Sequence, residues 1–262
     1  MRVLPNLDRY PFDRPGTAAS HALVADCRAQ HASDGMFYLP GFLHPAVAAE
    51  AAAALLPRFA TEAFRHEREH NIYFRDNAPG LAPDHPALVR FRTSNDTLCL
   101  DQIGDSPVAQ LYGWPPFAAF LAAAMDKPAL YPMADPLAGV NVMAYAEGQA
   151  LNWHFDRSEF TTTLLLQAPA EGGEFIYRND LRSDTDPNHD GVARLLRGED
   201  PGVRTLTLAP GTLNVFRGKN TPHCGGDVRG PVRRMIAVFS FYDRPGVTFT
   251  EAERIGFYGR AA

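Results

Sequence analysis

The sequence predicts an α+β protein whose core is mainly β, an antiparallel double-sheet β-roll with helices packed on its outside. Two observations lead to this prediction. Residues 1–135 contain Ala- and Leu-rich stretches typical of helices, whereas residues 136–250 contain many short runs of β-branched and aromatic residues. Turn-forming pairs such as Gly172-Gly173 and Pro210-Gly211 separate these runs, as expected for strands joined by tight connections.

A single domain spanning residues 1–262 fits the length of the chain. Its composition, 45% hydrophobic and 21% charged residues, is that of an ordinary globular protein. A helix-rich part, residues 1–135, precedes the β core of residues 136–250, and residues 251–262 form a C-terminal tail. A polar insertion at residues 179–203 interrupts the core. It is either a surface excursion between two strands or a lid over a pocket.

Few elements are expected in the N-terminal part. Met36–Leu39 is a short apolar strand-like run. The Ala- and Leu-rich segment Ala46–Leu56 predicts a helix, with Pro45 at its first position and Pro57 interrupting or ending it. A second helix is expected over Pro116–Asp126, where aromatic and aliphatic residues recur at helical spacing.

The core is expected to be built from short strands, with one turn over Ala146–Gln149 and one short helix around Val192–Leu196 in the insertion. Each predicted strand is rich in Val, Ile, Leu, Thr or aromatic residues and ends near Gly, Pro or Asp. In chain order, the predicted strands are Gly139–Tyr145, Phe160–Gln167, Glu174–Tyr177, Arg204–Leu208, Leu213–Phe216 and Arg234–Tyr242.

Charge and cysteine content limit the classes of partner. A net charge of -5 without a basic stripe argues against nucleic acid. Three widely spaced cysteines, Cys27, Cys99 and Cys224, form neither a disulfide framework nor a CxxC zinc site, which is typical of a reducing compartment. Met1–Asp8 lacks the apolar core of a secretory signal, and no apolar stretch of about 18 residues predicts a membrane helix. We therefore expect a cytoplasmic protein with a small-molecule partner, and leave open whether it is a monomer or a homodimer.

The most informative motif is His154-Phe155-Asp156. In extended backbone, positions i and i+2 point to the same side, so His154 and Asp156 can present a nitrogen and an oxygen to one point. His223, near the far end of the chain, is the natural third ligand. Two histidines and one carboxylate on one face of an octahedron leave three positions open, the pattern associated with non-haem Fe(II) oxygenases.

The motifs around these residues occur in a characteristic order over about half of the chain. They resemble the Fe(II)/2-oxoglutarate-dependent oxygenase superfamily. More narrowly, Leu195–Gly198 and Tyr242–Val247 resemble the branch that contains radical halogenases and hydroxylases of free amino acids. The matching segments are Tyr145–Gln149, Asn152–Asp156, Glu171–Phe175, Pro210–Phe216, His223 and Arg234.

This resemblance implies a double-stranded β-helix, of the jelly-roll or cupin type, with Fe(II) bound in its mouth by His154, Asp156 and His223. It also implies O2 and 2-oxoglutarate as co-substrates, and release of succinate and CO2. In the halogenases of this branch, the carboxylate position is Gly or Ala, which leaves a site for chloride. Because Asp156 is present here, we expect hydroxylation of an unactivated C–H bond in a small polar substrate, a free amino acid or a derivative.

Arg234 lies eleven residues beyond His223, at the interval where the superfamily places the arginine that binds 2-oxoglutarate. A guanidinium can grip a carboxylate through two parallel hydrogen bonds. Arg233 competes for this role, and the resemblance favours Arg234. Tyr145 and Arg92 are further candidates for the co-substrate site, although Tyr145 could instead pack in the core and Arg92 could lie on the surface.

Three residues are predicted to bind the substrate. Asn141 and Met143 share a strand face with Tyr145 by period-two spacing, and we expect them to line the pocket. Arg157, just beyond the metal motif, is placed to bind a charged end of an amino acid or to face solvent.

Two alternatives belong to other classes of protein. His66-Glu67-Arg68-Glu69-His70 matches HExxH, which in a helix would hold zinc and make the chain a metallopeptidase with Glu67 as general base. Its charged neighbours suit a solvated helix end better than a catalytic helix. The other alternative is a non-catalytic β-roll binding protein, in which we would expect a ligand to be lost. All three ligands and Arg234 are present.

Overall fold

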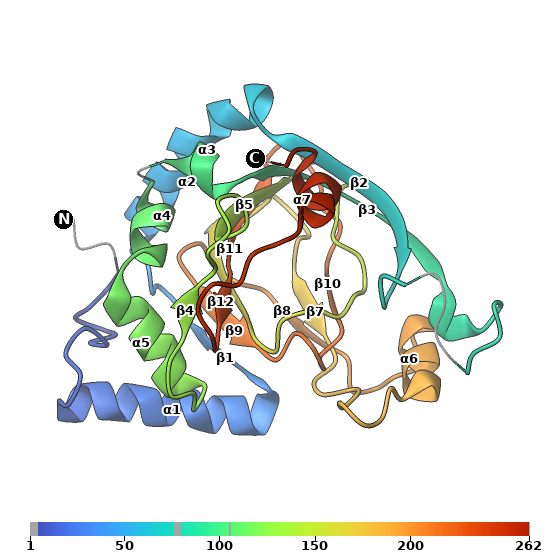
Figure 1. Cartoon of the computed structure of the whole chain (residues 1–262), viewed down its shortest axis with the longest axis horizontal. Helices are drawn as coiled ribbons and strands as arrows, with labels where there is room; N and C mark the ends of the chain where they lie inside the picture. The colour runs from blue at the N-terminus through green and yellow to red at the C-terminus, as the bar shows by residue number, and fades with distance from the viewer. Residues whose placement is uncertain (1–4, 76–79, 105, 262) are drawn as a thin grey trace.

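The computed structural model describes residues 5–75, 80–104 and 106–261, and in it two antiparallel sheets face each other (Figure 1). Residues 1–4 of the N-terminal segment considered above, and the last residue of the predicted tail, lie outside this description. The large sheet has seven strands and the small sheet three. A further short pair joins β12 (Phe241–Tyr242) to β4 (Tyr131–Pro132).

Both sheets are built from strands distant in sequence. In spatial order, the large sheet contains β1 (Met36–Leu39), β9 (Leu213–Phe216), β6 (Thr161–Gln167), β11 (Arg234–Phe239), β5 (Val140–Tyr145), β3 (Arg90–Leu98) and β2 (Phe64–Asn71). The small sheet contains β10 (His223–Gly225), β7 (Phe175–Tyr177) and β8 (Arg204–Leu206).

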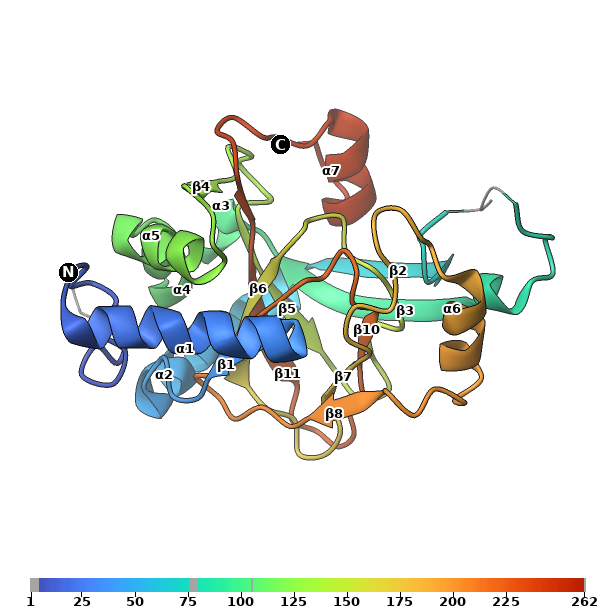
Figure 2. The same ribbon diagram turned by 90° about the horizontal axis from the view of Figure 1, so that it is seen from below.

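Helices from the N-terminal half cover one face of the large sheet, and the small sheet lies toward the other face, as the two views show (Figures 1 and 2). The remaining helices, α6 and α7, lie at the edges of the fold. The helical elements are α1 (Ala18–Asp34), α2 (Pro45–Thr61), η1 (Pro86–Leu88), α3 (Leu100–Ile103), α4 (Pro107–Tyr112), α5 (Pro115–Ala124), α6 (His189–Leu196) and α7 (Glu251–Tyr258). No helix among the described residues is long and apolar enough to cross a bilayer.

Alternation along β5 and β11 assigns each side chain to one of two environments. Val142 and Ala144 on β5, and Met235 on β11, point toward the helices and belong to the largest hydrophobic core. Their neighbours Tyr145 and Ile236 belong to a separate cluster on the opposite face. Because side chains alternate across a strand, the same strands that close the core also deliver residues to a cavity between the sheets.

The predicted architecture and most predicted elements of the core are confirmed, but Pro57 does not end the helix. α2 continues through Pro57 to Thr61. Phe59, beyond the proline, is buried against the core, and we attribute the persistence of the last turn to this packing.

The N-terminal part also contains two long strands that the sequence did not predict, β2 and β3, which pair along their whole lengths. Polar and charged residues occupy both faces of β2, so the alternation of hydrophobic and polar residues that signals a strand is missing. The tail contains α7, whose capping box links Thr250 and Glu253. The insertion contains the predicted short helix, α6, whose Val192 packs in one cluster with Phe155 of the metal motif.

Candidate metal centre

His154, Asp156 and His223 meet at the opening of the cavity between the sheets. One potential ligand atom from each residue lies within 4.8 Å of the others, and this is the one group among the described residues that could hold a metal through three such side chains. An isolated bridge pairs the backbones of His154 and His223 through two 3.0 Å hydrogen bonds. The Asp156 amide donates to the carbonyl of Gly218 at 3.0 Å, so the metal motif is fixed to the segment around β10.

The backbone also sets which nitrogen of each histidine is free. Nδ1 of His154 lies 2.8 Å from the carbonyl oxygen of Asn152, and Nδ1 of His223 lies 3.0 Å from that of Thr221. A carbonyl only accepts, so each Nδ1 must carry the proton and donate it. Both Nε2 atoms then keep a lone pair and face the Asp156 carboxylate, at 3.2 Å and 3.5 Å.

Electrostatics keep this ligand set in its metal-binding protonation states. Burial by itself raises the pKa of Asp156, but His223, His154 and a hydrogen bond from the Thr161 hydroxyl outweigh burial and hold that pKa well below its usual range. Burial, with the charge of His154 in addition, lowers the pKa of His223 to about 4. An ionised carboxylate and a neutral imidazole are therefore expected near neutral pH, as divalent iron requires.

Gly218 lies directly against the Asp156 carboxylate. A Cβ at position 218 would stand 2.2 Å from Oδ2 of Asp156 and 2.5 Å from Oγ1 of Thr161. Gly218→Ala is therefore expected to displace the carboxylate and to weaken metal binding by about 10-fold or more, the usual range for residues that orient a ligand. Metal titration followed by calorimetry measures this effect. Gly225→Ala is the matched control, because a Cβ there meets nothing within 4 Å; equal metal affinity in the two variants would contradict the prediction.

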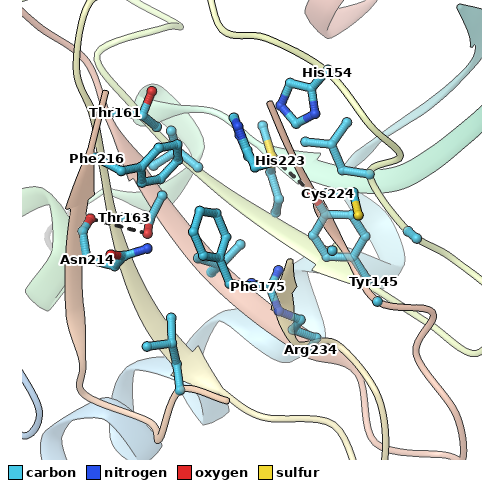
Figure 3. Close-up of a pocket in the computed structure, with 18 of the residues that line it drawn as sticks. Tyr145, His154, Thr161, Thr163, Phe175, Asn214, Phe216, His223, Cys224 and Arg234 are labelled. Atoms are coloured by element: carbon cyan, nitrogen blue, oxygen red, sulfur yellow. Dashed lines mark hydrogen bonds between the residues drawn. The ribbon is translucent and has the colours of Figure 1, made fainter. Parts of the chain in front are cut away.

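The first of two chambers beside the ligands has a volume of about 140 Å³ and runs between the sheets toward Arg234. Figure 3 shows the two histidines in this cavity together with Tyr145, Asn214 and Arg234. Arg234 is 8% exposed, its guanidinium carbon lies 5.5 Å from the centre of the Tyr145 ring, and burial lowers its pKa. Its neighbour Arg233 points away and pairs with Asp96 at 2.8 Å.

Polar atoms in this chamber lack partners. Nε of Arg234 and both side-chain polar atoms of Asn214 are buried without a hydrogen bond to any described residue. Buried groups of this kind are normally satisfied, and an unpaired buried cation is particularly unfavourable. A small guest with a carboxylate near Arg234 would satisfy them, and its other end would reach the three ligands. The chamber thus fits 2-oxoglutarate beside a metal ion.

Of the other residues predicted to bind co-substrate or substrate, Tyr145 and Met143 line this chamber, and Asn141 does not. Tyr145 is buried there, with its hydroxyl 3.6 Å from the sulfur of Met143, which lines both chambers. Asn141 does not line either chamber. Its amide donates to the Leu137 carbonyl at 2.8 Å, and its oxygen accepts from the Tyr258 hydroxyl at 2.9 Å, so it attaches α7 to the sheet.

The prediction for Arg92 is wrong. Its side chain is 69% exposed on the outer face of β3 and pairs with Glu67, away from both chambers. The backbone of Arg92, rather than its side chain, contributes to the site. Its carbonyl accepts a 2.9 Å hydrogen bond from the Asn152 side chain. The backbone N–H of Asn152 also donates to the hydroxyl of Thr93, at 3.0 Å. β3 thereby positions the turn that carries His154.

A second chamber, about 240 Å³ in volume, opens on the other side of the ligands beneath α7. It shares His154, Asp156 and Met143 with the first chamber. Arg157 lines it and pairs with Glu253 of α7 at 2.6 Å; its role in substrate binding stays a prediction. Aromatic residues are the most numerous class in its lining: Phe74, Phe155, Phe160, Phe239, Phe241, Tyr242, Phe249, Phe257 and Tyr258.

The zinc alternative fails because its helix does not exist. Residues His66 to His70 form part of β2, where His66, Arg68 and His70 point inward and Glu67 points out toward Arg92. In a strand, residues four apart are separated by roughly 13 Å. The two histidines therefore cannot share a zinc ion, and Glu67 cannot act beside them.

His70 serves the fold as a buried neutral side chain. Its Nδ1 donates to the Asn71 carbonyl at 2.9 Å, and its Nε2 accepts from the Thr93 hydroxyl at 2.7 Å. Burial lowers the pKa of His70 to about 4, against 6.5 for the free side chain, and the charge of Arg68 adds to this. Because the unfolded chain takes up the proton first, the free energy of unfolding should be intact above about pH 6.5 and fall as the pH decreases toward 4.

His70→Gln should make this pH dependence shallower by about one proton, since glutamine keeps a donor and an acceptor but does not titrate in this range. Denaturant unfolding of the metal-free protein between pH 4.5 and 7 measures the slope. An unchanged slope in the variant would show that His70 is not held neutral by the fold.

Several residues of the site were missed by sequence reasoning. Thr161 and Gly218 contact the Asp156 carboxylate, Asn214 lies in the first chamber, and Arg68 lines the second. Asn214 had a usable signal, since it is a polar residue inside an apolar strand. The others depend on contacts between distant segments, which spacing along the chain does not show.

No protein-family model matches this sequence, and no curated protein was found to match it. Solved structures resemble it along most of its length. An oxidoreductase of the 2OG-Fe(II) oxygenase family from Burkholderia pseudomallei is 15% identical, with a TM-score of 0.51 over 86% of this chain and 92% of its own. The non-haem alpha-ketoglutarate-dependent epimerase SnoN of nogalamycin biosynthesis is 18% identical, with a TM-score of 0.57 over 85% and 82%.

HygX from Streptomyces hygroscopicus, solved with nickel and 2-oxoglutarate bound, is 14% identical, with a TM-score of 0.55 over 86% of this chain and 87% of its own. Identities this low establish a common fold and nothing finer. The chain has the double-stranded β-helix fold of these non-haem iron proteins.

Proposed function

We propose that this protein is an Fe(II)/2-oxoglutarate-dependent oxygenase that hydroxylates an unactivated C–H bond of a small substrate. The observation that carries the proposal is the position of His154, Asp156 and His223 between two chambers, one of which ends in the buried and unpaired Arg234. The fold shared with HygX, whose structure holds nickel and 2-oxoglutarate, supports the same assignment.

In this proposal His154, Asp156 and His223 hold Fe(II), and Arg234 grips the distal carboxylate of 2-oxoglutarate through charge-assisted hydrogen bonds. Asn214 and Tyr145, which line the same chamber, would contact the rest of the co-substrate. Bound iron and 2-oxoglutarate supply the oxidant by activating O2, with conversion of 2-oxoglutarate to succinate and CO2. The net reaction adds one oxygen atom of O2 to the substrate and the other to succinate.

The chain itself contributes position and exclusion of water. The aromatic residues of the second chamber would surround the substrate, and His154 and Asp156, which line the same chamber, would hold the metal beside it. Asp156 would serve as a metal ligand at the position where the halogenases of the resembling branch have Gly or Ala, which favours hydroxylation over chlorination. The resemblance of Leu195–Gly198 and Tyr242–Val247 to hydroxylases of free amino acids supports an amino acid or a derivative as substrate.

Incubation of the purified protein with Fe(II), 2-oxoglutarate and O2 tests this function. The protein is screened with the proteinogenic amino acids, their N-acyl derivatives and the corresponding carboxylic acids. We expect succinate to form only with iron, and one substrate to gain the mass of one oxygen atom. His154→Ala should abolish both, whereas Arg197→Ala, on the exposed surface of the insertion, should not. Succinate formation that is independent of iron, or equal in the His154→Ala variant, would refute the assignment.

A further inference from the structure

Arg68 is a second cation that lacks a partner, on the substrate side of the ligands. It lies on the inward face of β2 and lines the second chamber. Its guanidinium carbon stands 4.1 Å from the centre of the Phe74 ring and 5.8 Å from that of Phe257. Its Nε is buried without a hydrogen bond, and the guanidinium makes no ion pair with any residue that the structure describes.

The surroundings of Arg68 make its charged guanidinium unfavourable unless an anion binds beside it. Burial, and then the charge of Arg157, lowers the pKa of Arg68. The nearby carboxylate of Glu253 does not compensate it, because that group is engaged with Arg157 and with the cap of α7. Aromatic faces offset part of the loss of hydration, but a partly buried guanidinium is stabilised more fully by an anion.

Among the described residues, the lining of the chamber also lacks a free carboxylate that would pair with a substrate cation. Among the described residues that line it, the one carboxylate is Asp156, which belongs to the ligand set. The guanidinium of Arg68 would repel an ammonium group, whereas that of Arg157 is paired with Glu253. The Phe74 ring lies against Arg68 and 5.6 Å from the His154 ring, so an apolar surface extends from Arg68 toward the ligands. The chemistry of the lining therefore selects a negatively charged group at one end and an apolar body at the other.

We propose that the second chamber binds a small carboxylic acid, with Arg68 on its carboxylate, its apolar body against the aromatic wall, and no free ammonium group. This rests on the proposed function and narrows it, from amino acids and their derivatives to acids whose amine is acylated or absent. One guanidinium in an apolar setting suits a monoanionic carboxylate, which it can bind through two parallel hydrogen bonds. Arg157 remains with α7 and closes that side of the chamber.

The test compares three probes of nearly equal shape: 3-phenylpropanoate, its uncharged analogue 3-phenylpropanamide, and phenylalanine, which adds an ammonium group to the acid. Each is titrated calorimetrically into protein loaded with Fe(II) and saturating 2-oxoglutarate without oxygen, so that Arg234 is already occupied. We expect the acid to bind about 10-fold or more tightly than either other probe, since a hydrogen bond to a charged group contributes that much.

Two variants locate the effect. Arg68→Met should weaken binding of 3-phenylpropanoate by about 10-fold or more and leave the amide unaffected, and Arg68→Lys should restore part of the affinity. Arg92→Met removes a guanidinium from the outer face of the same hairpin and should change nothing. Binding of phenylalanine or the amide as tight as that of the acid, no binding of the acid, or equal affinity of Arg68→Met for the acid would each overturn the proposal.

The same titrations separate this inference from the oxygenase assignment. Arg68→Met should keep the affinity of the wild type for 2-oxoglutarate, because Arg68 does not line the first chamber. If the wild type bound 3-phenylpropanoate through Arg68 but did not bind 2-oxoglutarate, the proposed function would fail and the substrate chamber would stand. If the wild type bound 2-oxoglutarate but showed no preference for 3-phenylpropanoate, the oxygenase assignment would stand and the carboxylic-acid proposal would fail.

Discussion

Asp156→Gly is expected to lower hydroxylation by about 100-fold or more. Residues that only orient a ligand typically change metal affinity or activity by about 10- to 100-fold, and Asp156 contributes the ligand atom and the negative charge. Its carboxylate lies 3.2 Å and 3.5 Å from the Nε2 atoms of the two histidines, so all three ligand atoms face one point. Iron affinity, measured by calorimetry, and product formation should both fall.

The control for this change is Asp184→Gly. Asp184 lies in the insertion, is 66% exposed and pairs with Lys219, so its loss should leave iron affinity and activity as in the wild type. Circular dichroism of both variants establishes that the fold is retained. Turnover of Asp156→Gly at the level of the wild type would show that the carboxylate is not a ligand.

Arg234→Met is expected to have opposite effects on co-substrate binding and on stability. Loss of two charge-assisted hydrogen bonds, each worth about 1.5 kcal/mol or more, should raise the dissociation constant for 2-oxoglutarate by about 100-fold. The same change removes a buried cation that has no described ion-pair partner, so the ligand-free protein should become more stable by about 1 kcal/mol or more.

These two effects are measured by titration with 2-oxoglutarate and by denaturant unfolding. Arg233→Met, at the neighbouring position on the outer side, provides the comparison: it breaks the pair with Asp96 and should destabilise the protein while leaving 2-oxoglutarate affinity unchanged. A loss of 2-oxoglutarate affinity in Arg233→Met rather than in Arg234→Met would reverse the assignment of the two arginines.

Local sequence patterns predicted those parts of the fold in which neighbours in sequence determine the environment. Strands β5, β6 and β9 lie where β-branched and aromatic runs predicted them. The Gly172-Gly173 pair predicted a turn, and both residues have positive φ angles. A Cβ on Gly173 would stand 2.8 Å from the Arg234 side chain, so this turn also leaves space for the arginine.

Other features could not be predicted because they depend on distant contacts. The polar strand β2 is held in the sheet by β3, and neither has a clear hydrophobic alternation. The HExxH pattern was misleading for the same reason, since its residue types suit a helix while its position in the sheet makes it a strand. Arg68 and Arg92 show the same dependence on distant contacts. They lie on the paired strands β2 and β3, and the packing of the folded sheet decides that Arg68 faces a chamber while Arg92 faces outward.

His154 and Asp156 were predictable because their spacing is local, and His223 and Arg234 because the motifs around them occur in a characteristic order. His154 and Asp156 are two residues apart, and Arg234 begins the strand that follows His223. Asn214 and Gly218 belong to a segment that meets the metal motif only after folding, through Thr161 and the backbone of Asp156. The second chamber was the hardest part to predict from the sequence, because β2, β3, β11, β12 and α7 all contribute residues to its lining.

Calorimetric titration of 2-oxoglutarate into the protein without oxygen tests the central claim most directly, because it requires the three ligands, the metal and Arg234 together. With Fe(II) present, we predict one 2-oxoglutarate bound per chain, with binding strongly weakened when iron is omitted or when His154 or Arg234 is replaced. Equal binding with and without iron, or binding unaffected by both replacements, would contradict the account.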